Sequence, residues 1–345
     1  MPAPFVEGYS TLGRRAAPGM DRTSGRCGPT AFLRPIYCAS PLFAFEAAAG
    51  VISARVDANV QTVRRQFQMR AARFAAHDAI VREVAMRLFE RLAYMRQAAA
   101  RVVDLGCGRG ACRRQLQRQF PSAQWLGIDL SEAMLRGGGR TILWSERVQR
   151  WVGRKNTPVR ICADAERLPL ANDSVDVVFS NLMLHWHPQP HLVVAEIARV
   201  LRAGGLVLFS SYGPDTCKEL RALCQSTLAA ARPMPFVDMH DLGDMLIAAG
   251  FETPVMEADT LRLSFGSSRA LLTEARALGG NPRTDRSPAL VSGARARALL
   301  AALQALADEH GRIPLSFEIV FGHGWKRAPR ATAMHAIALP RSLRK

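Results

Sequence analysis

A glycine-rich turn is the first segment of the chain whose residues could bind a ligand. Asp104, Gly106, Gly108 and Gly110 stand at alternate positions in the run DLGCGRG. Glycine permits positive φ angles and close approach of a ligand to the backbone, and the start of a following helix offers free N–H groups to a carboxylate. Because many kinds of nucleotide-binding protein contain such a turn, it alone predicts only a nucleotide site.

Two acidic segments farther along the chain strengthen this prediction. Asp129 ends the second predicted strand, about 20 residues beyond the turn, where a carboxylate can accept hydrogen bonds from both ribose hydroxyls. Asp164, Ala165 and Glu166 follow the third predicted strand and are suited to contact the edge of an adenine. The order of these elements favours a bound nucleotide cofactor over a purely structural glycine turn.

The elements that must position these residues are predicted to form an α/β fold. Short apolar runs alternate with helical patterns, and the helix after the glycine turn shows Cys112, Leu116 and Phe120 on one face. This alternation predicts a parallel sheet with helices on both faces. The predicted strands are residues 102–105, 125–128, 159–162, 175–179 and 206–210.

Further elements are expected on either side of these strands. Apolar residues at helical spacing predict two amphipathic helices within residues 60–93. A helix over residues 241–249 precedes strands at 260–265 and 315–322. The helical segment 264–312 is assigned as a lid over the substrate, because so long a connection in a compact domain is usually functional. The catalytic domain is predicted to span residues 56–327, before a basic tail (328–345). Residues 1–55 are expected to be an N-terminal extension with little fixed structure or the product of a mis-assigned start.

Composition limits the class of protein. The net charge is +17, from 46 Lys and Arg against 29 Asp and Glu, and residues 136–160 and 326–345 hold two basic runs. These favour an anionic partner or simply a solvated basic face. Seven dispersed cysteines indicate a reducing cytoplasm rather than a disulfide framework, and no metal site is expected. No apolar run reaches the roughly 20 residues that a membrane span needs.

The cofactor segments resemble the class I methyltransferase family. DLGCGRG resembles its first motif, GIDLSEAML its second, and ADAERLPL its adenine-contacting segment. The resemblance implies a Rossmann-like fold with a mostly parallel seven-stranded sheet and S-adenosyl-L-methionine as the cofactor. It also implies that Asp104 faces the methionine amine and Asp129 the ribose, while Asp164 and Ala165 lie at the adenine.

A closer resemblance covers residues 67–326. FQMRAARFAAH, SNLMLHW, FSSYGPDT and GRIPLSFEIVF resemble, in collinear order, the malonyl-acyl-carrier-protein O-methyltransferases of biotin synthesis. This resemblance implies N-terminal helices that cover the active site and methyl transfer to the free carboxylate of a malonyl thioester. Phe74 departs from the family, in which a tyrosine often stands there, so a hydroxyl that could hold the substrate carboxylate is missing.

The implied reaction sets the requirements for a substrate site. A malonyl carboxylate is already ionised near neutral pH, so no general base is expected. A cation or hydrogen-bond donor should hold the malonyl head, and an exposed basic surface should receive an acidic carrier protein, or the pocket should accept malonyl-CoA. The pocket candidates are Asn181, His185, Trp186, Tyr212 and Phe74, each of which could instead have a structural role. Arg199, Arg221 and Arg283 are possible carboxylate partners, without a choice among them.

Other functions remain open at this level. FSNLMLHW and GWK also resemble the mitochondrial complex I assembly factor that hydroxylates an arginine, and some quinone-ring methyltransferases share the cofactor motifs. The basic charge would suit an RNA-binding methyltransferase. Nucleic acid ranks lower as a partner, because the chain has no basic platform interleaved with aromatic residues and no recognisable RNA-binding module.

Overall fold

The computed structural model describes residues 59–137, 158–227, 234–278 and 293–328. All of them belong to one compact unit, Leu42–Lys345. The predicted extension at residues 1–55, most of the basic run at 136–160, Arg283 and nearly all of the basic tail lie outside the described residues. The domain boundaries at residues 55 and 327 therefore stay predictions.

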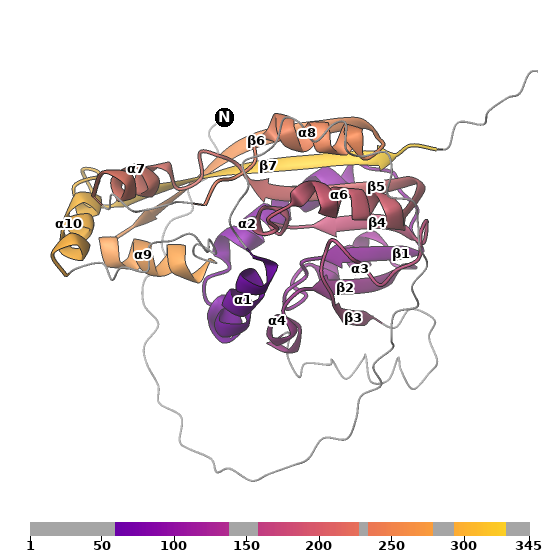
Figure 1. The fold of residues 1–345 in the computed structure, drawn as a ribbon, viewed down its shortest axis with the longest axis horizontal. Coiled ribbons are helices and arrows are strands. Elements are labelled where there is room, and N and C mark those ends of the chain that lie inside the picture. Colours follow the sequence, from indigo (N-terminus) through magenta and orange to yellow (C-terminus); the bar gives the residue numbers. More distant parts are fainter. Residues whose placement is uncertain (1–58, 138–157, 228–233, 279–292, 329–345) are drawn as a thin grey trace, which may run out of the picture. The chain divides into compact units, whose positions relative to one another are not determined.

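Seven strands form one sheet in the order β3-β2-β1-β4-β5-β7-β6 (Figure 1). The first five strands are parallel, and β7 runs antiparallel to both of its neighbours. This is the fold of class I methyltransferases, as predicted. The strands are β1 (Arg101–Leu105), β2 (Gln124–Asp129), β3 (Val159–Cys162), β4 (Val175–Ser180), β5 (Leu201–Tyr212), β6 (Phe251–Phe265) and β7 (Ile313–Lys326).

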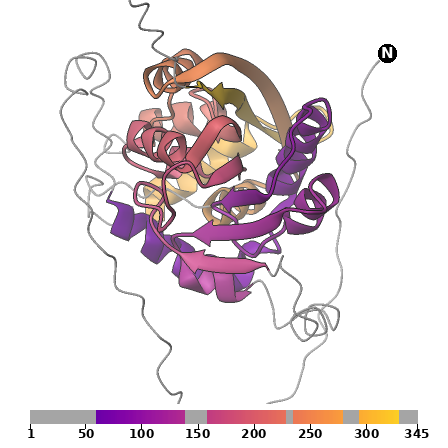
Figure 2. The same cartoon turned by 90° about the vertical axis from the view of Figure 1, so that its right-hand side faces the viewer.

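Helices pack on both faces of the sheet, as the view in Figure 2 shows. Successive residues of β1 alternate between two hydrophobic clusters: Val102 packs with residues of α2 and α3, and Val103 with residues of α6 and α8. These helices are α2 (Ala79–Ala93), α3 (Arg113–Gln119), α6 (Pro190–Val200) and α8 (Met239–Ala248). The glycine turn therefore leads from the centre of the sheet into a helix on one face.

The remaining helices of the described residues are α1 (Val60–Phe74), α4 (Glu132–Gly137), η1 (Leu184–Trp186), α7 (Lys218–Thr227), α9 (Ser268–Ala277) and α10 (Gly293–Gln304). The pair α1 and α2 confirms the predicted N-terminal helices. Between β6 and β7, α9 and α10 confirm the predicted helical character of the described part of that segment, and Leu271, Leu299 and Leu303 anchor them in the core. Both α4 and α9 contact α1.

The last strands are longer than their apolar patterns predict. The start of β5 carries exposed residues at 202–204, so only its apolar second half was recognisable from sequence. Exposed and half-buried residues largely alternate along β6, which lies at the edge of the sheet and pairs with β7 from Phe251 to Phe265. Backbone pairing with β7, rather than burial of both faces, extends this strand.

Candidate cofactor and substrate site

A cavity of about 360 Å³ lies at the carboxyl ends of the parallel strands. Its floor is formed by residues that follow β1, β2, β3 and β4, and its cover by residues of α1 and α2. Ligands of open α/β sheets bind at this edge. Of the predicted site residues, the lining includes Phe74, Asp104, Gly106, Gly108, Asp129, Asp164, Ala165, Asn181, Trp186 and Tyr212.

The glycine turn brings the backbone against the cavity. The φ angles of Gly106, Gly108 and Gly110 are 74°, 52° and 82°, in the left-handed region that favours glycine. A Cβ atom on Gly106 would also overlap the side chain of Met183. Gly110 does not belong to the cavity lining, so its contribution is to the conformation of the turn.

Asp129 connects the end of β2 to this turn. Its Oδ2 accepts a hydrogen bond from the N–H of Gly108 at 2.8 Å, and its Oδ1 accepts one from the N–H of Ser131 at 2.8 Å. Burial raises the pKa of Asp129, and these two N–H groups partly counteract that rise. Each carboxylate oxygen still has a free lone pair, so the side chain could accept hydrogen bonds from a pair of ribose hydroxyls.

Asp104 is the most deeply buried acid that lines the cavity. It is 2% exposed, and its Oδ2 has no hydrogen-bond partner among the described residues. Burial raises the pKa of Asp104 to about 7; the Trp125 side chain opposes the rise, and Asp129 adds to it. An ammonium group bound beside Asp104 would compensate the buried charge, because an opposite charge favours the ionised form.

The third acidic segment lies beside a histidine that the sequence did not single out as a ligand-site residue. His187 Nδ1 accepts the N–H of Gln189 at 3.1 Å, and Nε2 lies 3.4 Å from Asp164 Oδ1. The contact with His187 lowers the pKa of Asp164 and keeps it ionised. His187 also lines the cavity, so it holds Asp164 in place at this end of the site.

Most of this chain is similar in sequence to known proteins. Residues 103–209 match the family described as methyltransferase domain. The malonyl-[acyl-carrier protein] O-methyltransferase of Laribacter hongkongensis is 38% identical over 268 residues, which cover 78% of this chain and 90% of that protein. The enzyme of the same name from Gallionella capsiferriformans is 38% identical over 271 residues, covering 78% and 92%. The chain belongs to the malonyl-acyl-carrier-protein O-methyltransferase family.

As a class I methyltransferase, this family member uses S-adenosylmethionine. The donor set fits that cofactor. The unpartnered buried oxygen of Asp104 suits its ammonium group, and the paired oxygens of Asp129 suit its ribose. Gly106 and Gly108 line the cavity, so their backbone can lie beside the methionyl tail.

Aromatic side chains join the covering helix of this methyltransferase to the sheet domain. The rings of Phe67 and Trp186 meet edge to face with centroids 5.3 Å apart, and Phe74 lies 6.2 Å from Phe67. All three side chains line the cavity. They form an apolar wall between the covering helix and the 3-10 turn after β4.

Asn181 lines the cavity but uses its amide within the fold. Its Nδ2 donates to the carbonyl of Val81 at 2.9 Å, and its Oδ1 accepts from Ser210 Oγ at 2.8 Å. These bonds connect the end of β4 to α2 and β5. Asn181 is therefore a structural tie between the covering helices and the floor of the cavity.

Of the predicted pocket residues, only His185 lies outside the cavity lining. The substrate roles predicted for the others are not tested by any contact among the described residues. Its ring lies 4.4 Å from that of Tyr212, and its Nδ1 accepts the N–H of Tyr212 at 3.3 Å. Burial lowers the pKa of His185 to about 3, so the ring is neutral. His185 thus supports Tyr212 from behind. Burial raises the pKa of Tyr212, whose phenol stays protonated and able to donate.

The cations of the cavity differ from those considered on sequence grounds. Arg199 binds Glu196 and the carbonyls of Leu168 and Leu170, and Arg221 binds the carbonyl of Pro214; neither lines the cavity. The lining arginines are instead Arg64, Arg82 and Arg109. Arg109 belongs to the glycine turn itself. Sequence offered no signal to choose Arg64 and Arg82, because their position depends on how α1 and α2 dock over the sheet.

Arg64 and Arg82 have different surroundings. Arg82 pairs with Asp78 at 3.0 Å and its side chain is 65% exposed, so it lies at an opening of the cavity. Arg64 forms no ion pair among the described residues, and its Nε is buried without a hydrogen-bond partner there. Its positive charge acts on Cys162, at the end of β3. Arg64 therefore lies near the end of β3.

Neither a metal site nor a membrane span is found in the part of the chain that the structure describes. No group of three or more His, Cys, Asp and Glu side chains is arranged there to hold a metal ion. Among the same residues, no helix has the length and apolar character required to cross a bilayer.

Proposed function

We propose that this protein transfers the methyl group of S-adenosylmethionine to the free carboxylate of a malonyl thioester carried by an acyl carrier protein. The product is the malonyl methyl ester that primes the pimeloyl chain of biotin. The observation that supports this most strongly is the 38% identity to the Laribacter protein over 268 residues, well beyond the methyltransferase-domain match at residues 103–209. The relatedness therefore includes regions outside the cofactor domain.

In this proposal the acidic side of the cavity binds the cofactor. Asp104 pairs with the ammonium group, Asp129 accepts the ribose hydroxyls, and Asp164 with Ala165 contacts the adenine. Gly106, Gly108 and Gly110 shape the turn beside the methionyl tail. The bound cofactor supplies a methyl group on a positively charged sulfur. Arg64 completes the cover above the ribose and adenine.

The other side of the cavity receives the malonyl head. Its carboxylate is ionised near neutral pH and can attack the methyl carbon without a general base. Charge disappears in that displacement, so exclusion of water and positioning of the reactants are the main contributions of the protein. Phe67, Phe74 and Trp186 exclude water, the Tyr212 hydroxyl donates to the malonyl group, and Arg82 attracts its carboxylate at the opening.

The domain and compartment assignments form part of the same proposal. Residues 56–327 act as the catalytic domain, and the insertion at 264–312 covers the substrate, in keeping with Leu278 in the cavity lining. The enzyme works in the reducing cytoplasm on a carrier protein with an acidic surface, or on malonyl-CoA. Five cysteines are free among the described residues.

The competing functions lack comparable support. An arginine hydroxylase, a quinone-ring methyltransferase and an RNA methyltransferase would share parts of the fold, but the relatives that match most of this chain bear the malonyl-carrier name. A nucleic acid would also have to reach a methyl group beneath the aromatic cover of α1.

A direct assay tests the proposal. The purified full chain is incubated with radiolabelled S-adenosylmethionine and malonyl carrier protein, beside a demethylated quinone precursor and an RNA oligomer. We expect a base-labile methyl ester on the malonyl carrier alone, and restored growth without biotin in a strain that lacks the malonyl methyl ester step. Label on the quinone precursor or the RNA, with none on the malonyl carrier, would refute the proposal.

A further inference from the structure

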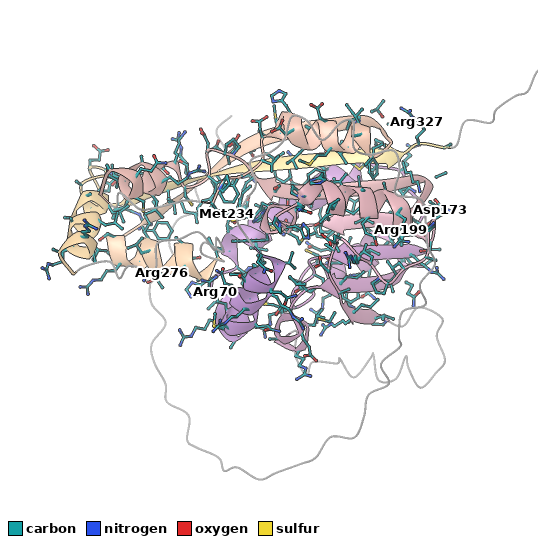
Figure 3. All side chains as sticks on the ribbon, in the orientation of Figure 1. Arg70, Asp173, Arg199, Met234, Arg276 and Arg327 are labelled. Atoms are coloured by element: carbon teal, nitrogen blue, oxygen red, sulfur yellow. The ribbon has the colours of Figure 1, made fainter. Side chains whose placement is uncertain are left out.

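The cover of the cavity carries an unusual balance of charge. The sequence of α1 contains four arginines and no acid, and α9, which contacts α1, contains two arginines and one acid. That acid, Glu274, is already engaged by His77 Nδ1 at 2.6 Å. Figure 3 labels Arg70 on α1 and Arg276 on α9, in the region where these helices approach each other. The cover is therefore strongly cationic.

The outer face of α1 combines cations with an exposed apolar side chain. Arg65, Met69 and Arg73 follow one another at four-residue spacing, so they share a face of the helix. Residues of the other face line the cavity, Phe67 among them. Met69 is 67% exposed. Arg65 and Arg73 are exposed and form no ion pair among the described residues.

The exposed face of α9 repeats this pattern with Arg269 and Arg276. Both side chains are exposed, and neither pairs with a carboxylate in the described ranges. On the β6 side of the molecule, in contrast, arginines are paired: Arg91 pairs with Glu257 at 2.6 Å, and Arg327 with Glu252 at 3.0 Å. The contrast distinguishes the cover from the β6 side of the molecule, where cations and acids alternate.

This cationic face leads to the opening of the cavity. Met86 lines the cavity yet is 49% exposed. Arg82, one turn before it on α2, also lines the cavity and is exposed. Phe74, the residue after Arg73, also lines the cavity, as does Asp78 at the start of α2. A partner bound to the outer face of α1 would therefore lie beside the entrance, with its tethered substrate able to enter.

We infer that Arg65, Met69 and Arg73 of α1, together with Arg269 and Arg276 of α9, form the docking surface for the acyl carrier protein. The inference rests on the proposed function and adds the site of partner recognition to it. The partner must present acidic side chains around an apolar contact, so that the arginines meet its acids and Met69 meets its apolar residue. Such pairs at the rim of an interface mainly raise the association rate and fix the orientation.

Charge reversal tests this surface. Arg65→Glu/Arg73→Glu and Arg269→Glu/Arg276→Glu are each assayed with malonyl carrier protein and with malonyl N-acetylcysteamine, a small thioester that bears the same reacting head. We expect each pair to raise the KM for the carrier protein about tenfold, with the small thioester unaffected. Raising the salt concentration should weaken use of the carrier by the unmodified enzyme and have less effect on the variants.

A matched control reverses two arginines at the opposite edge of the sheet. Arg96 precedes β1 and Arg118 lies in the last turn of α3; both are exposed, and neither forms an ion pair among the described residues. Arg96→Glu/Arg118→Glu changes the net charge equally and should leave both acceptors unaffected. Arg65→Gln/Arg73→Gln provides a milder change, in case reversal disturbs α1, and should shift the KM for the carrier in the same direction.

The outcomes separate the docking surface from the function itself. An equal loss with the control pair, an equal loss on the small thioester, or an unchanged KM for the carrier would overturn the docking surface and leave the function standing. RNA that binds this face more tightly than the carrier would overturn it as well. Methylation of neither acceptor by the unmodified enzyme would refute the proposed function, and the docking surface with it.

Discussion

The carboxylate of Asp129 accepts the backbone N–H of Gly108 at 2.8 Å and so joins the end of β2 to the glycine turn after β1. Ser131 donates its N–H to the second oxygen, also at 2.8 Å. Both carboxylate oxygens are therefore oriented by backbone groups before any ligand arrives. One side chain organises the turn and presents acceptors to the cavity.

Asp129→Asn should damage both roles, because an amide has one acceptor oxygen where the carboxylate has two. We expect a loss of about 1–2 kcal/mol in the free energy of unfolding and at least about tenfold weaker binding of S-adenosylhomocysteine. Denaturant titration and calorimetry measure the two effects. Asp238→Ala is the control: it removes the N-cap of α8, whose carboxylate accepts the His240 N–H at 2.8 Å, and should lower stability without affecting binding.

Asp104 should make cofactor binding depend on pH. Its pKa of about 7 lies above the ordinary 3.8, so the folded protein retains a proton between these values that the unfolded chain releases. The contribution of Asp104 to the free energy of unfolding therefore falls as pH rises through that window, and levels off above about 7. Since an ammonium group binds ionised Asp104, affinity for S-adenosylhomocysteine should rise about tenfold or more from pH 5.5 to 7.5.

Asp104→Asn provides the comparison. The amide cannot ionise, so we expect affinity to be weaker by about tenfold or more at pH 7.5 and nearly independent of pH. The free protein should at the same time be at least as stable as the unmodified one at pH 7.5, because a buried charge is gone. A pH dependence of binding that persists in the variant would show that another group causes it.

Gly106→Ala should prevent cofactor binding for steric reasons. Alanine at φ 74° is strained by about 1–2 kcal/mol, and its Cβ would overlap Met183 at the cavity wall. Gly204→Ala separates the two effects, since Gly204 has a φ of 72° but nothing lies within 4 Å of its Cβ position. We expect similar backbone strain from both, with loss of S-adenosylhomocysteine binding in calorimetry for Gly106→Ala alone.

Phe67 and Trp186 should be energetically coupled. A double-mutant cycle with Phe67→Leu and Trp186→Leu is expected to give about 0.5–1.5 kcal/mol of coupling from their edge-to-face contact. Each single variant should lower kcat/KM markedly and the free energy of unfolding only slightly, because the cover helix is held less firmly over the cavity. Additive effects on stability in the double variant would contradict the contact.

The position of the acids that line the cavity was predictable because their signals are local. A glycine turn between a strand and a helix fixes the place of Asp104, and the end of the next strand fixes that of Asp129 at the same edge of the sheet. The position of the other predicted pocket residues depends on tertiary docking. His185 and Trp186 are neighbours in sequence, yet Trp186 lines the cavity while His185 packs against Tyr212 and Phe236.

The lining arginines show the same limit. Arg64 reaches the cavity because α1 contacts α4 and the Phe67–Trp186 contact holds it there. Arg82 reaches it from α2, which the Asn181 amide ties to the end of β4 through the carbonyl of Val81. No periodicity distinguishes them from the other arginines of these helices. The full length of β6 escaped prediction for a related reason, since it follows from pairing with a strand some 50 residues later rather than from its own apolar pattern.

The place of β7 in the sheet has a consequence for synthesis of the chain. This strand is made last, yet it lies between β5 and β6 and hydrogen-bonds to both. The half of the sheet that holds the glycine turn, β1 to β4, can pair as the ribosome produces it, whereas β6 must wait for residues 313–326 to emerge. A ribosome-bound chain cut short before Ile313 would therefore leave β6 without its neighbour, and an exposed strand edge for chaperones to protect.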